Sequence, residues 1–278
     1  MKTLVILFGL IGCSSNNGHN KEIGEKTQIQ EYEVVQKSVI GDDLYVENEN
    51  IKYEEQENII LKGIQNKIID SALEGFAKKD IKKLVELEKR LNESKINNKN
   101  LKNYWLAYIN YYKTIINYNI NKDEKTAKES SKIGIKLLES NSPLNTDDYA
   151  LLVLLKSLTY PWENSIFLTQ EINNIIEKMD RAGKESIRTL YAKASIDFYT
   201  PKIYGGGKQV EELLKRVIDN KETKKSDDEE YPSWGKEEAY DMLIRFYIKE
   251  NNKKEASKYY ERAKEYFPNS KIIRNYKI

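Results

Sequence analysis

From about residue 59 onward, apolar positions recur with the period of an α-helix. The first run repeats every four residues, so it lies on one helix face, and it comprises Ile60, Ile64, Ile68, Ala72 and Phe76. We expect helices over about residues 59–76, 80–91, 101–119, 126–140, 145–161, 164–181, 184–200, 207–220, 233–250 and 252–267. About ten helices with short connections predict an all-α stack of αα-hairpins rather than a single bundle.

The last expected hairpin carries aromatic and small residues at fixed intervals. Offsets 0, 4, 7 and 12 of its second helix are occupied by Ala256, Tyr260, Ala263 and Pro268. The alanines let paired helices approach closely, the aromatic rings fill the space beside them, and the proline ends the helix. This spacing resembles the tetratricopeptide (TPR) repeat, a helix–turn–helix unit of about 34 residues. Ile244 departs from the repeat, which prefers glycine there, and a generic amphipathic hairpin is the alternative.

The preceding hairpin repeats the theme with an inserted turn. Phe198 and Val210 are twelve residues apart, three more than in the last hairpin, and Pro201–Gly206 lies between them. This Pro-x-x-Tyr-Gly-Gly turn resembles a group of bacterial TPR lipoproteins, and also the T component of TRAP-type transporters. The clear resemblance covers about residues 188–268, and it implies a TPR-like solenoid over residues 59–278. A partial unit around Tyr108 has an inter-helix gap six residues too long.

The N-terminus resembles the signal of a bacterial lipoprotein. Residues 4–11 are mostly apolar, follow Lys2, and are too few to cross a bilayer as a helix. Cys13 is the only cysteine, and Gly12 precedes it. The resemblance to a lipobox implies that residues 1–12 are a signal peptide and that the Cys13 thiol is acylated. It also implies a lipid-anchored location on the bacterial cell membrane or outer membrane, facing the periplasm or cell surface. A buried ordinary cysteine is the alternative.

Residues 13–58 are expected to form an acidic, flexible tether between the anchor and the repeat domain. Residues 14–58 contain four Lys and eleven acidic residues, a charge of −7, and the total of +2 then leaves +8 for residues 59–278. A flexible chain of this length spans roughly 35–40 Å. The basic body could meet an acidic partner, anionic lipid or its own tether, with a solvated mixed surface as the alternative.

The composition excludes several kinds of chemistry. One His and one Cys allow no zinc cluster and no disulfide framework, and His19 lies in the expected tether, away from any triad. Gly205–Lys208 lacks the spacing of a phosphate-binding loop. A total charge of +2 makes no case for nucleic acid. We therefore expect no enzyme, no metal and no cofactor.

The resemblance implies that a ligand would bind the concave face, which the first helix of each TPR unit lines. The residues it places there are Asn103, Asn110, Lys113, Ile196, Tyr199, Asp241, Arg245 and Ile248. Amide and cationic side chains can hold a peptide backbone or a terminal carboxylate. The aromatic residues of 104–118 either pack between helices or line a groove for extended chains or sugars. We expect a protein- or peptide-binding scaffold, and the alternative is a transport accessory of the TRAP T-component type.

Overall fold

The computed structural model describes residues 60–183, 185–221, 229–270, 273 and 276, and everything below refers to these residues. They contain ten α-helices and no strand. The helices are α2 Ile64–Lys78, α3 Lys82–Glu93, α4 Lys99–Ile116, α5 Glu124–Glu139, α6 Thr146–Ser157, α7 Ser165–Ala182, α8 Ile187–Tyr199, α9 Val210–Asp219, α10 Lys236–Lys249 and α11 Lys253–Tyr266. The expected all-α class is therefore confirmed.

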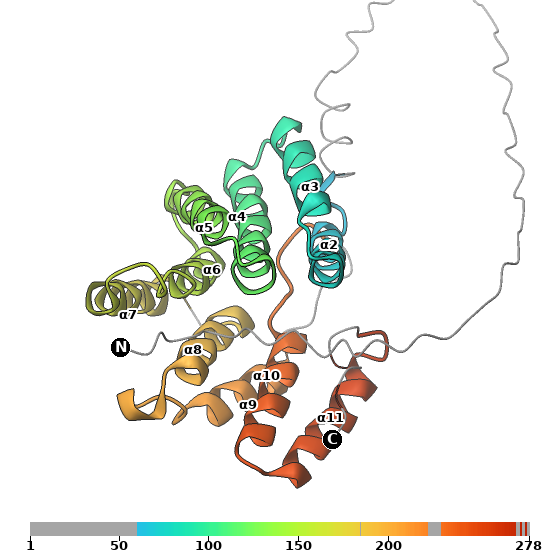
Figure 1. Ribbon diagram of the computed structural model, residues 1–278, viewed down its shortest axis with the longest axis vertical. Helices are drawn as coiled ribbons and strands as arrows, with labels where there is room; N and C mark the ends of the chain where they lie inside the picture. Colours follow the sequence, from blue (N-terminus) through green and yellow to red (C-terminus); the bar gives the residue numbers. More distant parts are fainter. Residues whose placement is uncertain (1–59, 184, 222–228, 271–272, 274–275, 277–278) are drawn as a thin grey trace, which may run out of the picture.

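The helices pair into five successive hairpins that stack into an arc (Figure 1). Helices α2, α4, α6, α8 and α10 each contact the next member of that series and form the inner layer. Helices α3, α5, α7, α9 and α11 each pack beside their hairpin partner and form the outer layer. This two-layer order is that of a helical-repeat solenoid, in which each hairpin buries its apolar face against its neighbours.

Polar side chains at helix starts explain several of the boundaries. The spacing of Asn145 and Asp148 predicts a helix start, and the structure places a reciprocal capping box there. Asn145 Oδ1 accepts the backbone N–H groups of Asp147 and Asp148 at 2.8 and 2.9 Å, while Asp148 accepts the Asn145 N–H at 2.9 Å. Asp123 begins α5 in a similar way by accepting the Thr126 N–H at 3.0 Å.

The last hairpin packs as its residue spacing predicts. Ala256 and Ala263 on α11 are fully buried, and so is Tyr240 on α10. Ile244 is also fully buried although the repeat pattern prefers glycine at that place, so the layer accommodates its larger side chain. Small residues at these contacts let the two helix axes approach closely, and the larger residues around them fill the space.

The partial repeat unit has its long gap because α4 continues into a π-helical turn, Asn117–Asn121. Lys122 then adopts a left-handed conformation with φ of 58°, which ends the helix before α5 begins. A π turn inserts residues without breaking the helix, so it lengthens the first helix of the unit. The six extra residues are therefore accommodated by a longer α4 and its π turn.

Candidate functional site

Part of the inner face of the arc is occupied by the segment that leads into α10. We call this segment, Glu230–Gly235, the latch; in Figure 1 it runs from the start of α10 toward α2 and α4. Trp234 of the latch is 3% exposed, and its Nε1 donates a hydrogen bond to the Tyr104 hydroxyl oxygen at 2.7 Å. The inner face, where the TPR resemblance places ligands, is filled here by the chain itself.

The latch joins the first hairpin to the last. Gln65 Oε1 on α2 accepts the backbone N–H of Ser233 at 2.7 Å, and Trp105 Nε1 on α4 donates to the carbonyl oxygen of Glu230 at 2.8 Å. Side-chain bonds to backbone groups hold an extended segment without any regular structure of its own. The ends of the arc are thus connected through their inner side as well as through the stacked helices between them.

The aromatic residues of α4 pack around the latch and around one another. The Tyr108 ring is stacked on the Trp234 ring, with centroids 6.1 Å apart and planes 13° from parallel. Tyr191 of α8 meets Trp234 edge-on at 6.0 Å. The Tyr108 hydroxyl bonds that of Tyr112 at 3.2 Å, and burial raises the pKa of both phenols. These rings are therefore packed between helices, as the simpler of the two sequence interpretations expects.

Three of the candidate binding residues form one polar cluster on the inner layer. Arg245 Nε donates to Asp241 Oδ2 at 2.8 Å, and its NH1 group donates to the Tyr199 hydroxyl at 3.2 Å. Phe198 lies under the guanidinium, 5.2 Å from ring centroid to Cζ. Burial is the largest influence on the pKa of Arg245 and lowers it, but Asp241, Tyr199 and Tyr276 together outweigh burial, so the net shift of the pKa is upward. The guanidinium therefore stays charged and paired within the chain.

The candidates on α4 make their contacts elsewhere. Asn103 donates to the side-chain oxygens of Ser140 and Asn141, at 3.1 and 3.0 Å, in the α5–α6 connection. Asn110 and Lys113 both bond Glu88 of α3, at 2.7 and 2.6 Å, and both are buried. These side chains join α4 to neighbouring helices rather than to the Tyr199 cluster. All three are hydrogen-bonded within the protein.

The remaining candidates divide between the surface and the tether. Ile248 is 42% exposed near the end of α10, and Ile196 is partly buried against the core. Cys13, the signal peptide expected at 1–12 and the tether expected at 13–58 lie outside the described residues. Their assignment stays a prediction from the sequence.

Glu238 is a titratable residue of the inner face that sequence reasoning missed. Its Oε2 accepts the Gly235 N–H at 2.7 Å and so closes the latch onto the first turn of α10. Burial raises the pKa of Glu238 to about 7, and the charges of Glu237 and Asp241 add to the rise. Gly235 has φ of 113°, which favours glycine, and a glutamate three residues later is a capping signal that could have identified this pair.

The inserted turn between α8 and α9 is held closely at its base. The Asp197 carboxylate accepts the backbone N–H groups of Gln209 and Val210 at 2.7 and 2.9 Å, and the Asp197 carbonyl oxygen accepts the Gly207 N–H at 2.9 Å. The first amides of α9 are thus satisfied by the chain's own carboxylate. At Gly206, an added Cβ would lie 2.0 Å from the Thr200 carbonyl oxygen, so only glycine fits.

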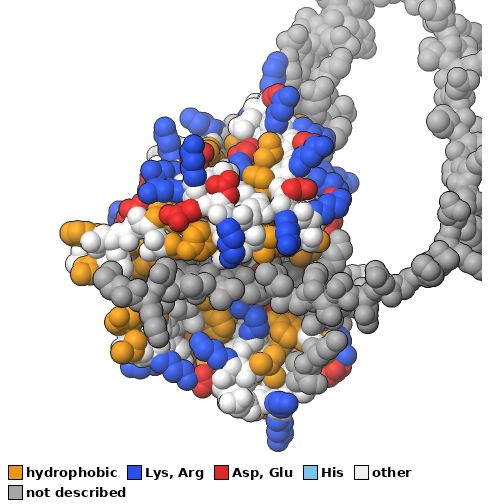
Figure 2. All heavy atoms as spheres, in the orientation of Figure 1, with side chains coloured by type: hydrophobic (Ala, Val, Ile, Leu, Met, Phe, Trp, Pro, Cys, Tyr) orange, Lys and Arg blue, Asp and Glu red, His pale blue; other side chains and the backbone are white. Residues whose placement is uncertain are grey.

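The tip of this turn presents two large apolar side chains to solvent. Ile203 is 85% exposed and Tyr204 is 78% exposed, both on the 3₁₀ turn Lys202–Tyr204. Lys202 pairs with Glu250, the residue that follows α10, at 2.8 Å, which ties the turn to the next hairpin. Figure 2 shows apolar side chains gathered at this edge of the molecule.

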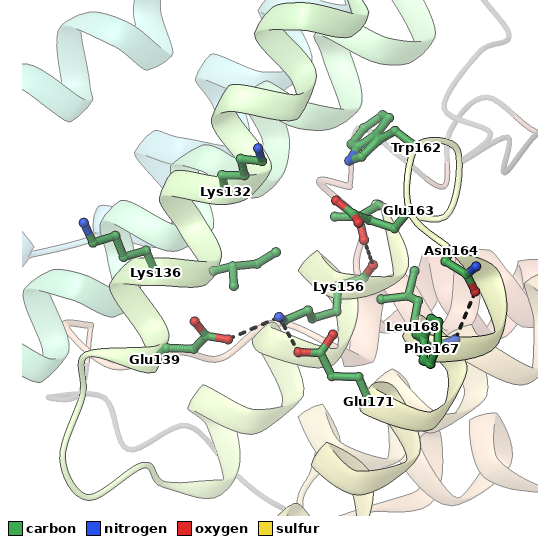
Figure 3. Close-up of a pocket in the computed structure, with 12 residues that line it drawn as sticks. Lys132, Lys136, Glu139, Lys156, Trp162, Glu163, Asn164, Phe167, Leu168 and Glu171 are labelled. Atoms are coloured by element: carbon green, nitrogen blue, oxygen red, sulfur yellow. Dashed lines mark hydrogen bonds and ion pairs between the residues drawn. The ribbon is translucent and has the colours of Figure 1, made fainter.

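A second feature of the surface is a cleft of about 400 Å³ between α5, the end of α6 and the start of α7, which we call the outer cleft (Figure 3). Lys156 lies in its floor and pairs with Glu139 at 3.2 Å and with Glu171 at 2.6 Å. Burial opposes the charge of this ammonium, yet the two carboxylates outweigh it and raise the pKa of Lys156. Lys132 and Lys136 line the same cleft and have no ion pair among the described residues.

The described residues contain no group of three or more metal-ligating side chains that could hold an ion. Within the same residues, no helix is both long and apolar enough to span a membrane. Comparisons of the chain with protein-family models, with curated proteins and with solved structures each found no match.

The order and pairing of the helices define the fold class, which is an all-α solenoid of stacked helical hairpins.

Proposed function

We propose that this protein is a TPR-like lipoprotein of the bacterial envelope that acts as a non-enzymatic scaffold and binds a protein partner. The N-terminal signal-like run with its single Cys13 supports the anchor, and the hairpin solenoid supports the scaffold role. Two or more acyl chains hold a protein stably on a membrane, whereas one does not.

The observation that carries the partner-binding proposal is the exposed tip of the inserted turn. Large apolar side chains that stand in solvent on a well-held turn are typical of interaction sites, because they bury much area at little cost in entropy. Ile203 and Tyr204 have this character, whereas Trp234 fills part of the inner face. We infer that a partner covers Ile203 and Tyr204 with an apolar pocket of its own.

Site-specific photocrosslinking in cells tests this proposal. A photoreactive residue at position 204 should trap a defined partner, and Ile203→Ser combined with Tyr204→Ser should abolish its co-purification. Ile133→Ser is the matched control, since Ile133 is also an exposed apolar residue, at 47%, but lies on α5. Equal capture by the turn variant and the control would contradict the proposal.

The anchor has a separate test. Cys13→Ser should leave the protein unprocessed or free of the membrane, because only the thiol can form the thioether to the diacylglyceryl group. Processing and membrane fractionation measure this outcome. If the variant remained processed and acylated, Cys13 would not be the anchor.

The alternative function is a transport accessory of the TRAP T-component type, handing a small solute to its binding protein. That role calls for a hole or an enclosed apolar pocket along the inner side of the arc. The latch occupies part of that side, with Trp234 and Tyr108 stacked within it. We therefore favour the scaffold, and a bound small molecule recovered with the purified protein would favour the alternative.

A further inference from the structure

The cationic side of the outer cleft continues along one face of α5. Lys128, Lys132 and Lys136 follow one another every four residues, so their side chains form a row. None of them has an ion pair among the described residues. Figure 2 shows Lys and Arg side chains gathered on this part of the surface. Like charges at this spacing weaken a helix slightly, and no ion pair among the described residues offsets that cost.

The other side of the cleft combines apolar side chains and one unused donor with the carboxylates of Glu163 and Glu171, the second of which pairs with Lys156. Phe167, at the start of α7, is 70% exposed, and Leu168 beside it is buried. The Trp162 Nε1 atom is buried and has no hydrogen-bond partner in the structure. In Figure 3 the Trp162 indole stands at one end of the cleft, opposite Phe167 and Leu168.

These groups define the chemistry of the molecule that would fill the cleft. The carboxylates of Glu139 and Glu171 are taken up by Lys156, whereas Lys132, Lys136 and the Trp162 N–H have no acceptor among the described residues, so an occupant that meets them must supply acceptors. Carboxylates meet that need and pair with the free lysines. The exposed Phe167 ring favours an aromatic or aliphatic side chain between them. The fitting occupant is an acidic peptide segment that also carries apolar residues.

We propose that the outer cleft binds residues 31–49 of the same chain. This segment, which lies outside the described residues, has six acidic residues and one Lys, a charge of −5. Its acidic residues are Glu31, Glu33, Asp42, Asp43, Glu47 and Glu49. Tyr32 and Leu44-Tyr45-Val46 stand between them and supply apolar side chains.

The length of the chain allows this contact. Residues 49 and 60 are eleven positions apart, and a chain extends by about 3.3–3.6 Å per residue, so the connection reaches roughly 36–40 Å. Helix α2 contacts α4, and α4 contacts α5. Two packing steps of about 8–10 Å each separate α2 from the cleft, to which the length along the helices is added. Covalent attachment gives the segment an effective concentration in the millimolar range, so even weak binding is populated.

Docking of this segment would shorten the free part of the tether. Only residues 14–30 would then separate the docked segment and the repeat domain from Cys13. The domain would lie close to its anchor with α5 and α7 turned toward the tether. The exposed turn at Ile203 belongs to a different surface, so this inference and the proposed partner site can fail independently.

Zero-length carbodiimide crosslinking of the full chain, carrying Cys13→Ser to keep it free of lipid, tests the proposal. Mass spectrometry should find Lys132 and Lys136 joined to carboxylates of residues 31–49. Lys178, an exposed lysine farther along α7, is the matched control and should give about ten-fold less product, because a random encounter lacks the paired hydrogen bonds. Equal yields at all three lysines would overturn the proposal.

Two variants and a lipid arm sharpen the result. Replacing the six acidic residues by their amides leaves Lys37 as the reactive group of the segment, and its crosslinks to carboxylates of the repeat domain should fall about ten-fold. Replacing Lys132 and Lys136 by Gln leaves Lys128, and its crosslinks to residues 31–49 should fall about ten-fold. The melting temperature should be unchanged in both variants. A synthetic peptide of residues 31–49 should compete, and its amide version should not. If anionic phosphatidylglycerol vesicles protected both lysines while no tether crosslink formed, the cleft would bind membrane and the proposal would be wrong.

Discussion

The inner face and the outer cleft of the arc both contain tryptophan, yet the indole N–H groups differ in whether they have a hydrogen-bond acceptor. On the inner face, the Nε1 atoms of Trp105 and Trp234 each find an acceptor, at 2.8 and 2.7 Å, within the chain. In the outer cleft, the Nε1 atom of Trp162 is buried without one, and two neighbouring lysines have no ion pair among the described residues. Residue type alone therefore does not separate packing from binding. For the three tryptophans, the partner of the Nε1 atom makes the distinction, since a buried donor without an acceptor costs free energy.

The comparison is most directly tested at Trp234, where we expect the largest effect. Trp234→Ala removes a 3% exposed indole that touches α4 and α8, and it should lower the free energy of unfolding by about 3–5 kcal/mol. Urea denaturation measures the loss. Tyr231→Ala, a 51% exposed residue of the same latch, should change stability by less than about 0.5 kcal/mol. Equal effects of the two variants on stability would show that Trp234 does not hold the latch on the inner face.

The titration of Glu238 gives the inner face a pH dependence. Its pKa of about 7 exceeds the ordinary value of 4.5, so the folded state holds a proton that the unfolded chain has released between these pH values. Stability therefore falls as pH rises from 4.5 to 7, by up to about 3 kcal/mol at 1.36 kcal/mol per unit. Glu238→Gln keeps an acceptor for Gly235 and removes the charge.

Denaturation of this variant at two pH values checks the sign. Glu238→Gln should be more stable than the parent at pH about 8 and nearly equal to it at pH about 4, where the parent carboxyl is protonated. Glu265→Gln, on the exposed side of α11, should change stability little at either pH. A variant that was less stable at the higher pH would mean that the Glu238 charge stabilises the latch.

Much of the fold could be predicted from the sequence because it depends on local patterns. The periodic apolar residues, the Asn145 capping box and the Ala256–Ala263 spacing each act within one helix or hairpin. The cluster of Tyr199 with Asp241 and Arg245 was also within reach, since the repeat places adjacent first helices side by side.

The latch could not be predicted in this way. Trp234 and Tyr104 are 130 positions apart, and no periodicity relates the loop before α10 to the inner face of α4. Glu88 similarly reaches Asn110 and Lys113 from another hairpin, which assigns these candidates to packing contacts. Such long-range pairs form only once the hairpins have stacked. The local pattern of the sequence therefore could not decide whether the inner face is an open groove or is filled by the latch.

The outer layer has a prediction of intermediate size at Ala263. This residue is fully buried between α10 and α11, so Ala263→Leu should overpack the contact and cost about 1–3 kcal/mol. Glu265→Leu adds a comparable side chain on the exposed side of the same helix and should have a much smaller effect. Thermal unfolding of both variants measures the difference. A fully tolerated Ala263→Leu would mean that the helices pack more loosely there than the repeat spacing requires.

The smallest effect on stability is expected at the inserted turn, and it separates binding surface from packing most clearly. Ile203 and Tyr204 are 85% and 78% exposed, so folding removes little of their area from water. Ile203→Ser with Tyr204→Ser should change the free energy of unfolding by less than about 0.5 kcal/mol, while Asp197 still holds the base of the turn. Urea denaturation measures this beside partner capture. A loss above about 1 kcal/mol would place the two side chains in the packing of the fold, whereas unchanged stability with lost capture would assign them to a partner.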